Sequence, residues 1–488
     1  MKTGPRAGRP DNGVALIVDN PKRDLAGIAL LGHELVQRGL DPHLVPMNIQ
    51  VAEVTALPVS SVLINYLRPN NEALVGGLIA AGMPVAICDT EGAVYRDAER
   101  LVAKMSRSDE IRGAVAAYCA WGEFAADYLT ENGYHRADQV ELTGSPRFDF
   151  YSSDWRDVTR RVHETPLTGD RPVVMLCGSF PFANSAFGEP AMEIERRIAV
   201  TGLDRAKVDE EYAADCAALA SLVALANRLA SEFPEVDFVY RPHPFERVEA
   251  YDELLEPLDN LSVHASGTVD GWLLNVDFVI VPADCTIGIE AAMAGVPAVI
   301  PTWLGSEEAP SVTAATRSVE TDTELLEALR AAIEMRDDPM ARAAFAPSDA
   351  KDVVHRYFGP IDGESHQRVA DVVQSRLLGG PAPSRRALRS IHYRQGDANV
   401  SRQARALYAV RMALRLPAFW SFRRFSAPTS LSWDRNVKVF GAPDVNHILD
   451  AINDARPELT PVRALPVEQD RYDFGYRQGR SLRLVASG

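Results

Sequence analysis

The chain has 488 residues, of which 46% are hydrophobic and 24% are charged, and its formal net charge is −16. A chain of this length exceeds one ordinary hydrophobic core, so we expect two domains and an extension. The acidic balance argues against general nucleic-acid binding, and no window of 18 apolar residues predicts a conventional membrane span.

The five cysteines are spread along the chain, in a pattern typical of reduced thiols and not of a disulfide framework or a zinc site. The N-terminal residues MKTGPRAGRPDNG lack the apolar region of a signal peptide. We therefore expect a cytoplasmic protein.

Residues 1–155 are predicted to form a first Rossmann-like domain. Short apolar runs typical of buried strands alternate with amphipathic stretches typical of helices. The strand-like runs are VALIV (14–18), SVLINY (61–66), PVAICD (84–89) and VAAYCAW (115–121), and the helical stretches are residues 25–38, 71–81 and 124–132. This alternation predicts a parallel, doubly wound sheet.

Two carboxylates follow the strand PVAICD, where Asp89 and Glu91 stand in the sequence ICDTEGAVY. At the C-terminal end of a buried strand, a carboxylate can deprotonate a hydroxyl acceptor or attack an anomeric carbon. The alternative is an exposed turn in which one acid caps the next helix.

Other loops at the ends of predicted strands also carry polar groups. In the predicted topology these groups converge on one cleft. Each is weak by itself, because Gly, Ser and Pro populate every loop. The candidates for acceptor binding are Arg68, Asn70 and Asn71, and those for donor or phosphate binding are Gly144, Ser145, Gly178 and Ser179.

The strand and helix pattern restarts after TGSPRFDFYSSDW, and residues 165–378 are predicted to form a second Rossmann-like domain. The strands are expected in RPVVMLCGS, VDFVYRPHP, LSVHAS, VDFVIVPAD and VPAVIPTW, with helices over residues 209–232 and 286–294. Parallel sheets bind ligands at the C-terminal ends of their strands, so we expect a ligand cleft between the two domains.

A histidine stands between two prolines in YRPHPFER, directly after the strand VDFVY. The prolines end the strand and restrict the loop, so His243 is predicted to meet a ligand together with Arg241, Pro244 and Glu246. The alternative is a stiff surface turn with a solvated histidine.

A helix N-terminus is expected in VIVPADCTIGIEAAMAG, where Asp284, Cys285 and Thr286 follow a strand and Gly295 closes the helix. Backbone N–H groups at such a terminus bind phosphate. The alternative is that Asp284 and Thr286 only cap the helix.

Several common motifs are missing from the sequence. We find no GxGxxG after the first strand, no GxxxxGK[ST], no HExxH, no paired CxxC and no strict DxD. We therefore expect neither a bound cofactor nor a metal ion.

The sequence GGPAPS marks a linker, and residues 379–488 are predicted to form a basic, mostly helical extension. Between Arg385 and Arg424 there are ten arginines and one acidic residue. The mixture of arginines and aromatic residues from Arg402 to Arg424 suits a helix on an anionic membrane surface, at the inner face of the cell membrane. The alternative is a helix that packs on the acidic remainder of the chain.

The motifs TGSPRFD, RPHPFE and the run DCT to GVPAVIP, with the segment IDGESHQRVAD, resemble the GT-B glycosyltransferases of the bacterial surface carbohydrate biosynthesis family. The resemblance covers roughly residues 10–378. A looser likeness extends to enzymes that use CMP-activated sugars, in which Glu91-Gly92, His243-Pro244 and Thr286 match motif positions. Those families have adjacent acids where Thr90 separates Asp89 from Glu91 here.

This resemblance implies transfer of a sugar from a nucleotide-sugar donor, such as CMP-Kdo or another CMP-nonulosonic acid, to a surface polysaccharide, a lipopolysaccharide or a lipid-linked glycan. It implies that His243, Arg241 and Thr286 stabilise the leaving phosphate while Glu91 or Asp89 acts as base or nucleophile. The alternatives are a CDP-glycerol-type polyol-phosphate transferase, a sugar-nucleotide epimerase and a non-catalytic GT-B scaffold.

Overall fold

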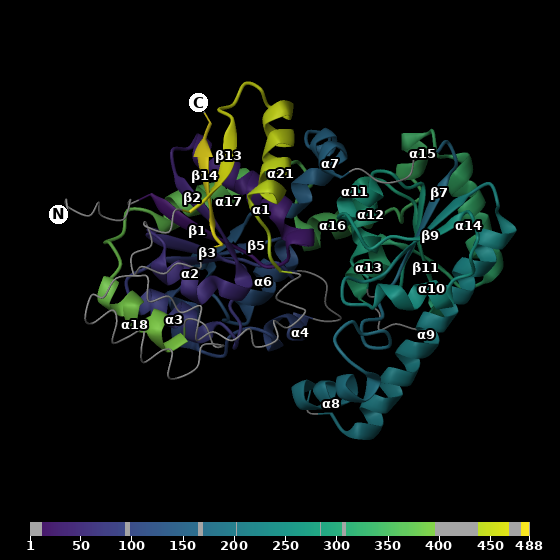
Figure 1. Ribbon diagram of the computed structural model, residues 1–488, viewed down its shortest axis with the longest axis horizontal. Helices are drawn as coiled ribbons and strands as arrows, with labels where there is room; N and C mark the ends of the chain where they lie inside the picture. Colours follow the sequence, from purple (N-terminus) through teal and green to yellow (C-terminus); the bar gives the residue numbers. More distant parts are fainter. Residues whose placement is uncertain are drawn as a thin grey trace, which may run out of the picture. The chain divides into compact units, whose positions relative to one another are not determined.

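The computed structural model describes residues 12–92, 98–163, 169–201, 203–283, 285–304, 309–395, 438–467 and 480–487. The chain divides into two compact units. Unit 1 comprises Met1–Gly92, Leu101–Val158 and Phe358–Gly488, and unit 2 comprises Ala93–Arg100 and Thr159–Tyr357. Each unit has one mainly or wholly parallel sheet with helices against it (Figure 1), so the predicted α/β fold with two Rossmann-like domains is confirmed.

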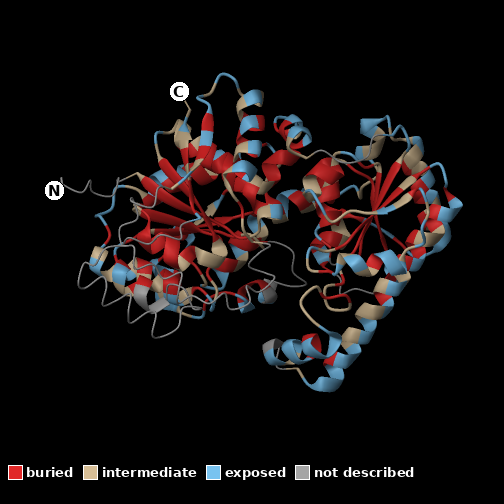
Figure 2. Ribbon diagram, in the orientation of Figure 1, coloured by how far each residue is buried: buried red, intermediate tan, exposed pale blue. Residues whose placement is uncertain are grey.

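The sheet of unit 1 has eight strands in the order β13-β14-β2-β1-β3-β4-β5-β6. These are β1 (Gly13–Val18), β2 (Asp41–Pro46), β3 (Ser61–Ile64), β4 (Val85–Cys88), β5 (Ala117–Ala120), β6 (Val140–Leu142), β13 (Val462–Pro466) and β14 (Leu482–Ala486). The strands β1 to β6 are parallel, and β1 to β5 are buried along their length (Figure 2). Their uninterrupted apolar runs follow from burial on both faces of the sheet.

Helices cover both faces of this sheet (Figure 1). On one face α1 (Pro21–Gln37) packs against α17 (Ser365–Val372) and α21 (Ala442–Ala455). On the other face α18 (Arg385–Gln395) packs against α2 (Gln50–Ala56) and α3 (Glu72–Ala80). The other described helices that lie wholly or partly in unit 1 are α4 (Ala98–Ala103), α5 (Asp109–Ala114), α6 (Glu123–Glu131) and α7 (Arg156–Val162), of which α4 and α7 extend into unit 2. Short segments of unit 1 are the 3-10 helices η1 (Met47–Ile49), η2 (Ala137–Gln139) and η3 (Pro146–Tyr151) and the π-helix η6 (Val373–Leu377).

The sheet of unit 2 has six parallel strands in the order β12-β11-β10-β7-β8-β9. They are β7 (Val173–Cys177), β8 (Asp237–Arg241), β9 (Leu261–Val263), β10 (Phe278–Ile280), β11 (Ala298–Pro301) and β12 (Arg317–Val319). The helices are α8 (Pro190–Thr201), α9 (Arg205–Glu232), α10 (Tyr251–Leu254), α11 (Val269–Leu273), α12 (Ile287–Ala294), α13 (Pro310–Ala315), α14 (Asp322–Glu334), α15 (Pro339–Ala343) and α16 (Ala350–Phe358).

Helix α9 is, within the described ranges, the helix that has the length and apolar composition to cross a membrane. Its C-terminal half supplies Leu222, Leu225 and Leu229 to the main hydrophobic core of unit 2, together with side chains of α14 and of the sheet. We therefore interpret α9 as a core helix.

The chain returns to unit 1 before residue 378, where the sequence predicted the end of the second domain. The buried carboxylate of Asp149 accepts hydrogen bonds from the backbone N–H groups of Ser365 (2.9 Å) and His366 (2.8 Å) and lies 2.9 Å from His366 Nδ1. These contacts fasten the start of α17 to unit 1.

The predicted helical extension, residues 379–488, contributes two strands as well as α18 and α21. Strand β14 pairs antiparallel with β2, and β13 pairs antiparallel with β14. Leu482, Leu484 and Val462 are buried, and charged or polar residues alternate with them, as in a strand that has one solvent-facing side. The predicted membrane-binding segment Arg402–Arg424 lies outside the described residues.

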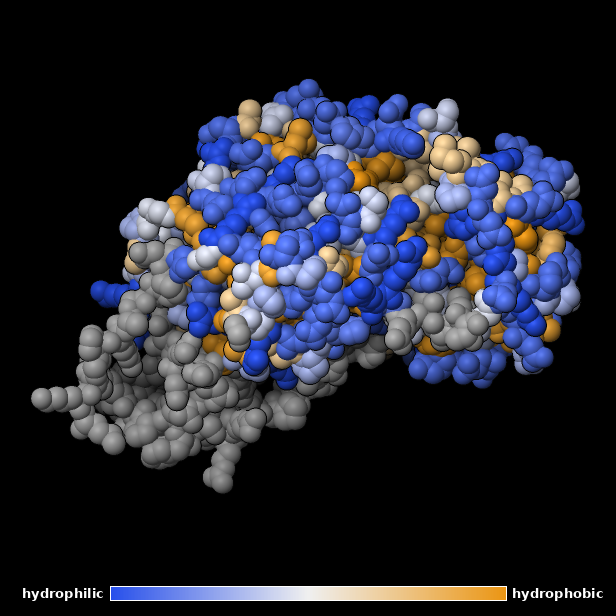
Figure 3. All heavy atoms as spheres, turned by 90° about the horizontal axis from the view of Figure 1, so that it is seen from above, coloured by the Kyte–Doolittle hydropathy of each residue, from blue (hydrophilic) through white to orange (hydrophobic). Residues whose placement is uncertain are grey.

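Hydrophilic side chains dominate the face seen in Figure 3, with smaller hydrophobic patches among them. The exposed large hydrophobic side chains of the described ranges are Leu142, Met192, Leu254, Trp303 and Met340. Most other large apolar side chains of these ranges are wholly or partly buried (Figure 2).

Candidate functional site

The chain order of unit 1 reverses direction in the sheet between β1 and β3, because β1 is followed by β2 on one side and β3 by β4 on the other. In open α/β sheets ligands bind outside the C-terminal ends of the strands at this switch point. Asp19 follows β1 directly, and Asn65 follows β3 directly. The candidate site of unit 1 therefore lies at this edge.

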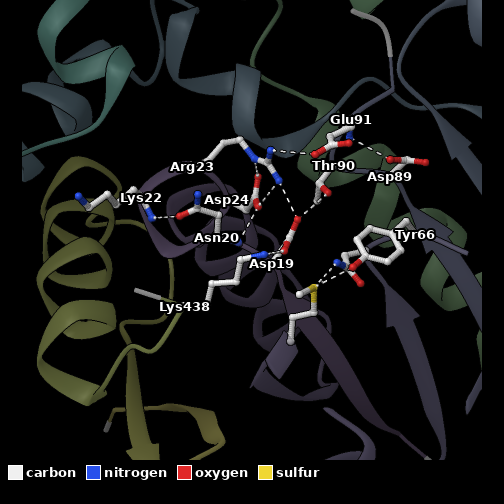
Figure 4. Close-up of polar contacts among 12 residues, drawn as sticks. Asp19, Asn20, Lys22, Arg23, Asp24, Tyr66, Asp89, Thr90, Glu91 and Lys438 are labelled. Atoms are coloured by element: carbon white, nitrogen blue, oxygen red, sulfur yellow. Dashed lines mark hydrogen bonds and ion pairs between the residues drawn. The ribbon is translucent and has the colours of Figure 1, made fainter. Parts of the chain in front are cut away.

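Six charged side chains gather there, and we call them the charge cluster: Asp19, Arg23, Asp24, Arg68, Glu91 and Lys438. Figure 4 labels all of them except Arg68. Figure 4 shows Arg23 between the carboxylates of Asp19, Asp24 and Glu91, with Lys438 beside Asp19. Arg23 Nη2 donates to Asp19 (2.9 Å), and Arg23 Nε donates to Asp24 (2.8 Å).

The first turn of α1 positions Arg23 and Asp24. The side chain of Asn20 caps the helix by accepting from the backbone N–H of Lys22, and Pro21 occupies the first helical position. Because the helix begins two residues after Asp19, its first turn stays at the end of β1.

Glu91 is the most exposed carboxylate of the charge cluster, with 37% of its side chain accessible. Arg68 donates to it over 2.8 Å, and Arg23 and Lys104 lie within 3.7 and 3.8 Å. Burial alone would raise the pKa of Glu91, but Arg68, Arg23 and Lys104 together lower it. Glu91 is therefore a partly exposed carboxylate that favours the ionised form.

Asp89 is buried beneath the same loop. Its carboxylate accepts from the Tyr118 hydroxyl (3.1 Å) and from the backbone N–H of Glu91 (2.9 Å). Burial raises the pKa of Asp89, and the positive charge of Arg68 only partly opposes that rise. The two carboxyls thus differ, since Asp89 is shifted toward the protonated acid and Glu91 toward the anion.

The three predicted acceptor-binding residues have different positions. The Arg68 guanidinium pairs with Glu91 and lies 4.3 Å over the Tyr66 ring, so it belongs to the site. Asn71 is buried, and its amide donates to the Tyr66 carbonyl (2.8 Å) and accepts from the Arg68 N–H (2.8 Å). Asn71 therefore shapes the loop, whereas Asn70 is exposed next to the Tyr66 hydroxyl (3.3 Å).

Sequence reasoning missed Asp19, Arg23, Asp24 and Lys438. The first three stand in VDNPKRD directly after the first strand, and the strand-end rule applied to the other loops selects them too. Lys438 carries no local signal, because it meets Asp19 across 419 residues of sequence.

In unit 2 the chain order reverses between β7 and β10. Gly178 and Ser179 follow β7, and Cys285 and Thr286 follow β10 and precede α12. The predicted donor-side residues thus flank the switch point of this sheet, where ligands bind in related topologies. Asp284 lies outside the described residues.

Thr286 begins α12 without capping it. Its side chain makes no capping hydrogen bond, and the residue is exposed at the N-terminus of the helix, which ends at Gly295 with φ of 71°. This observation disfavours the interpretation of Thr286 as only a cap, and leaves its hydroxyl at an end of a helix suited to anions. The neighbouring Cys285 is buried.

His243 lies in the loop after β8 and is half-buried, next to the exposed Pro244. Its Nδ1 accepts from the backbone N–H of Phe245 (3.2 Å), so a neutral imidazole carries its proton on Nε2. The His243 ring also meets the Phe245 ring edge-to-face at 5.3 Å. The histidine is therefore held in one tautomer and one orientation.

Glu246 fixes this loop from beneath. One carboxylate oxygen accepts from the backbone N–H groups of Phe180 (3.0 Å) and His243 (2.9 Å), and the other accepts from the Tyr251 hydroxyl. A Cβ on Gly178 would lie 2.9 Å from the same carboxylate, so glycine permits this close approach. Burial raises the pKa of Glu246, although the donors oppose the rise. These contacts make Glu246 a positioning residue for both loops.

Arg241 is also buried, and its guanidinium donates to the carbonyls of Ser266 (2.8 Å) and Gly267 (2.7 Å). These bonds hold the loop between β9 and α11. The predicted phosphate contact of Arg241 stays a prediction, and its observed contacts are structural.

Gly144 and Ser145 follow β6, an edge strand that β3, β4 and β5 separate from β1. Gly144 has φ of 71°, and a Cβ there would lie 2.5 Å from Ser365 Oγ. The turn therefore packs against the start of α17, at the edge of the sheet and away from the charge cluster. Within the described part of the chain, no group of His, Cys, Asp and Glu side chains is arranged to hold a metal ion.

Comparison with known proteins gives no family. No protein-family model matches the chain, and no curated protein matches it. Solved structures similar to it include the UDP-GlcNAc 2-epimerase from Neisseria meningitidis bound to UDP-GlcNAc, with 12% identity over 74% of this chain and 99% of that chain and a TM-score of 0.46. A UDP-GlcNAc 2-epimerase from Methanocaldococcus jannaschii has the same identity, coverage and TM-score.

The wall teichoic acid polymerase TagF is also similar, with 11% identity over 75% of this chain and 89% of that chain and a TM-score of 0.47. Likenesses at these levels assign no activity to the chain, so the functional argument rests on the residues at the two sheet edges.

Proposed function

We propose that the chain is an enzyme that acts on a nucleotide-activated sugar in the synthesis of a surface glycan. The observation that carries the proposal is the pair of polar strand-end sites, one at the switch point of each sheet. Unit 1 offers two carboxyls, Asp89 with a raised pKa and Glu91 with a lowered pKa. Unit 2 offers an oriented histidine and the N-terminus of α12, where the Thr286 side chain makes no capping hydrogen bond.

Each set of groups suits one part of such a substrate. Carboxylates and arginine bind sugar hydroxyl groups, and Glu91 or Asp89 would act on the sugar or on the attacking hydroxyl. Breaking a bond between a sugar and a phosphate builds negative charge on the phosphate, which His243 and the N-terminus of α12 would stabilise. This division supports a nucleotide-sugar enzyme over a non-catalytic scaffold.

The donor is tested by thermal unfolding with UDP-GlcNAc, GDP-mannose, CMP-N-acetylneuraminate and CDP-glycerol, each at about 1 mM. A ligand that binds only the native state raises its stability, so we expect one of the four to raise Tm and the His243→Ala variant to weaken that effect. His355, an exposed histidine of α16, gives the matched control, and His355→Ala should respond as the wild type. If no compound raises Tm, the proposal fails.

The reaction is tested by incubating the stabilising compound with the protein alone and following it by NMR. An epimerase changes the sugar without an acceptor, whereas a transferase leaves it intact or slowly hydrolyses it. Stabilisation by CMP-N-acetylneuraminate would support the CMP-sugar donor, and stabilisation by CDP-glycerol would support polyol-phosphate transfer. Glu91→Gln should lower turnover at least tenfold in either case.

A further inference from the structure

Five members of the charge cluster form a series of alternating charges that begins with Lys438 and ends with Arg68, and Figure 4 shows the series from Lys438 to Glu91. Lys438 Nζ lies 3.0 Å from Asp19, and Asp19 lies 2.9 Å from Arg23. Arg23 in turn lies 3.7 Å from Glu91, and Glu91 lies 2.8 Å from Arg68. A cation therefore separates each carboxylate of the series from the next.

Accessibility differs among the five members of this series, and Glu91 is the most exposed of them. Glu91 is 37% exposed, whereas the side chains of Lys438 and Asp19 are 15% and 7% exposed. Lys438 and Asp19 thus lie below the groups that a substrate would meet. Ion pairs connect Lys438 to Glu91 through Asp19 and Arg23.

Arg23 alone would serve three carboxylates, those of Asp19, Asp24 and Glu91. Lys438 occupies Asp19 Oδ1, while Arg23 and the Thr90 hydroxyl meet Asp19 Oδ2. Because Lys438 neutralises part of the charge of Asp19, Arg23 can also interact with the Glu91 carboxylate. Without Lys438, the uncompensated charge of Asp19 would draw Arg23 inward and repel the Glu91 carboxylate.

The segment that carries Lys438 is fixed to unit 1 by independent contacts. Helix α21 follows Lys438 and packs on α1, the helix that carries Arg23, and β14 joins the edge of the sheet at β2. The position of Lys438 is therefore set by the fold of the C-terminal segment as well as by its ion pair.

We propose that Lys438 is a positioning residue of the unit 1 site, which acts through Asp19 and Arg23 to keep Glu91 ionised and directed toward a substrate hydroxyl group. The inference rests on the proposed function, because Glu91 is taken there as the group that meets the substrate. It makes the C-terminal segment part of the site.

Among the described residues, the charged groups that face Glu91 include Arg23 on α1, Arg68 after β3, Lys104 after α4 and Asp89 in its own loop. Lys438→Met leaves all four in the chain and removes the cation that pairs with Asp19. The expected effect is a rise in the pH at which Glu91 takes up a proton, by roughly half a unit.

The test measures how the stabilisation by the nucleotide sugar that binds best in the four-compound panel depends on pH between 4 and 8. In Lys438→Met we expect the acid limb of this profile to move up by roughly half a pH unit, and Lys438→Arg to restore it. Arg483→Met is the control, because Arg483 of β14 pairs with Asp41 (2.6 Å) away from the charge cluster. It should lower stability and leave the acid limb in place.

An acid limb in Lys438→Met that coincides with that of the wild type overturns the inference and leaves the proposed function standing. Absence of binding by the wild type overturns the proposed function instead. In that case a double-mutant cycle of Lys438→Met with Glu91→Gln, followed by urea denaturation, still decides on the link between the two residues. Non-additive effects on stability support it, and strictly additive effects refute it.

Discussion

Replacing Glu246 by alanine should unfold or loosen unit 2, although Glu246 was predicted from sequence as a ligand-binding residue. The substitution leaves the backbone N–H groups of Phe180 and His243 and the hydroxyl of Tyr251 without their acceptor. A buried polar group without a partner costs about 1–3 kcal/mol. We expect Glu246→Ala to lower the free energy of unfolding by about 3–6 kcal/mol. This is less than three times the largest cost of one unpaired donor, because water that enters the space of the lost side chain can accept from some of the donors.

Glu246→Gln separates geometry from charge. The amide carbonyl of glutamine can still accept from both backbone N–H groups. Each hydrogen bond then has a neutral acceptor in place of a charged one, which lowers the free energy of unfolding by about 1 kcal/mol per bond. Removal of a buried charge opposes this loss, as the raised pKa of Glu246 indicates. We expect a net change of about 0–2 kcal/mol for Glu246→Gln.

The assay is urea denaturation followed by far-UV circular dichroism, with proteolysis of the loops after β7 and β8 as a local readout. Tyr251→Phe is the control, since it removes the hydroxyl that donates to the same carboxylate and accepts from the Tyr240 hydroxyl (3.3 Å), and its loss should fall between those of the two variants. A loss below about 1 kcal/mol for Glu246→Ala would refute the reasoning, because one unpaired donor already costs that much. Equal losses for the alanine and glutamine variants would show that charge, and not the acceptor geometry, holds the loops.

Unit 1 should lose stability as the pH falls from 6.5 toward 4, because burial lowers the pKa of His135 and of His392 from 6.5 to about 4. Between pH 4 and 6.5 the unfolded chain binds more protons than the folded one, so each histidine adds up to about 1.4 kcal/mol per pH unit to the slope of the free energy of unfolding against pH. His135→Gln should reduce this slope, which urea denaturation at several pH values measures. Gly144→Ala should destabilise unit 1 by about 2–4 kcal/mol, because its positive φ and the Ser365 hydroxyl both oppose a methyl group. Gly133→Ala, with φ of 68° and nothing within 4 Å, should cost only about 1 kcal/mol by the same denaturation assay, and equal losses would contradict the packing argument.

The parallel strands could be predicted because a strand that is buried on both faces of its sheet has a continuous run of apolar residues. The run VALIV became β1, and PVAICD became β4, each within a few residues of the prediction. Strands β13 and β14 have no continuous apolar run, because their buried residues alternate with less buried ones. The strand β2, with which β14 pairs, is also distant in sequence. A short alternating segment in a basic extension is compatible with several structures, and the pairing with β2 decides among them.

The site was predictable where its residues follow strands, as in the loop of Asp89 and Glu91 and in Arg68. It was not predictable where the fold decides what a charged group meets. Arg241 and Glu246 have the side chains expected at a phosphate site, yet both are used on neighbouring backbone groups. Sequence spacing cannot show this, because the carbonyls that occupy Arg241 belong to a loop after another strand.

The pairing of β14 with β2 imposes an order of events during synthesis. Arg483 and Asp41 are 442 residues apart, which corresponds to about 20–90 s of translation at 5–20 residues per second. Throughout that interval β14 is not yet available to pair with β2, so this edge of the sheet lacks its native partner. The sheet of unit 2 comes from the single stretch Thr159–Tyr357, so it can be complete before the sheet of unit 1 is closed at β2. The middle of this chain is therefore able to mature before its beginning.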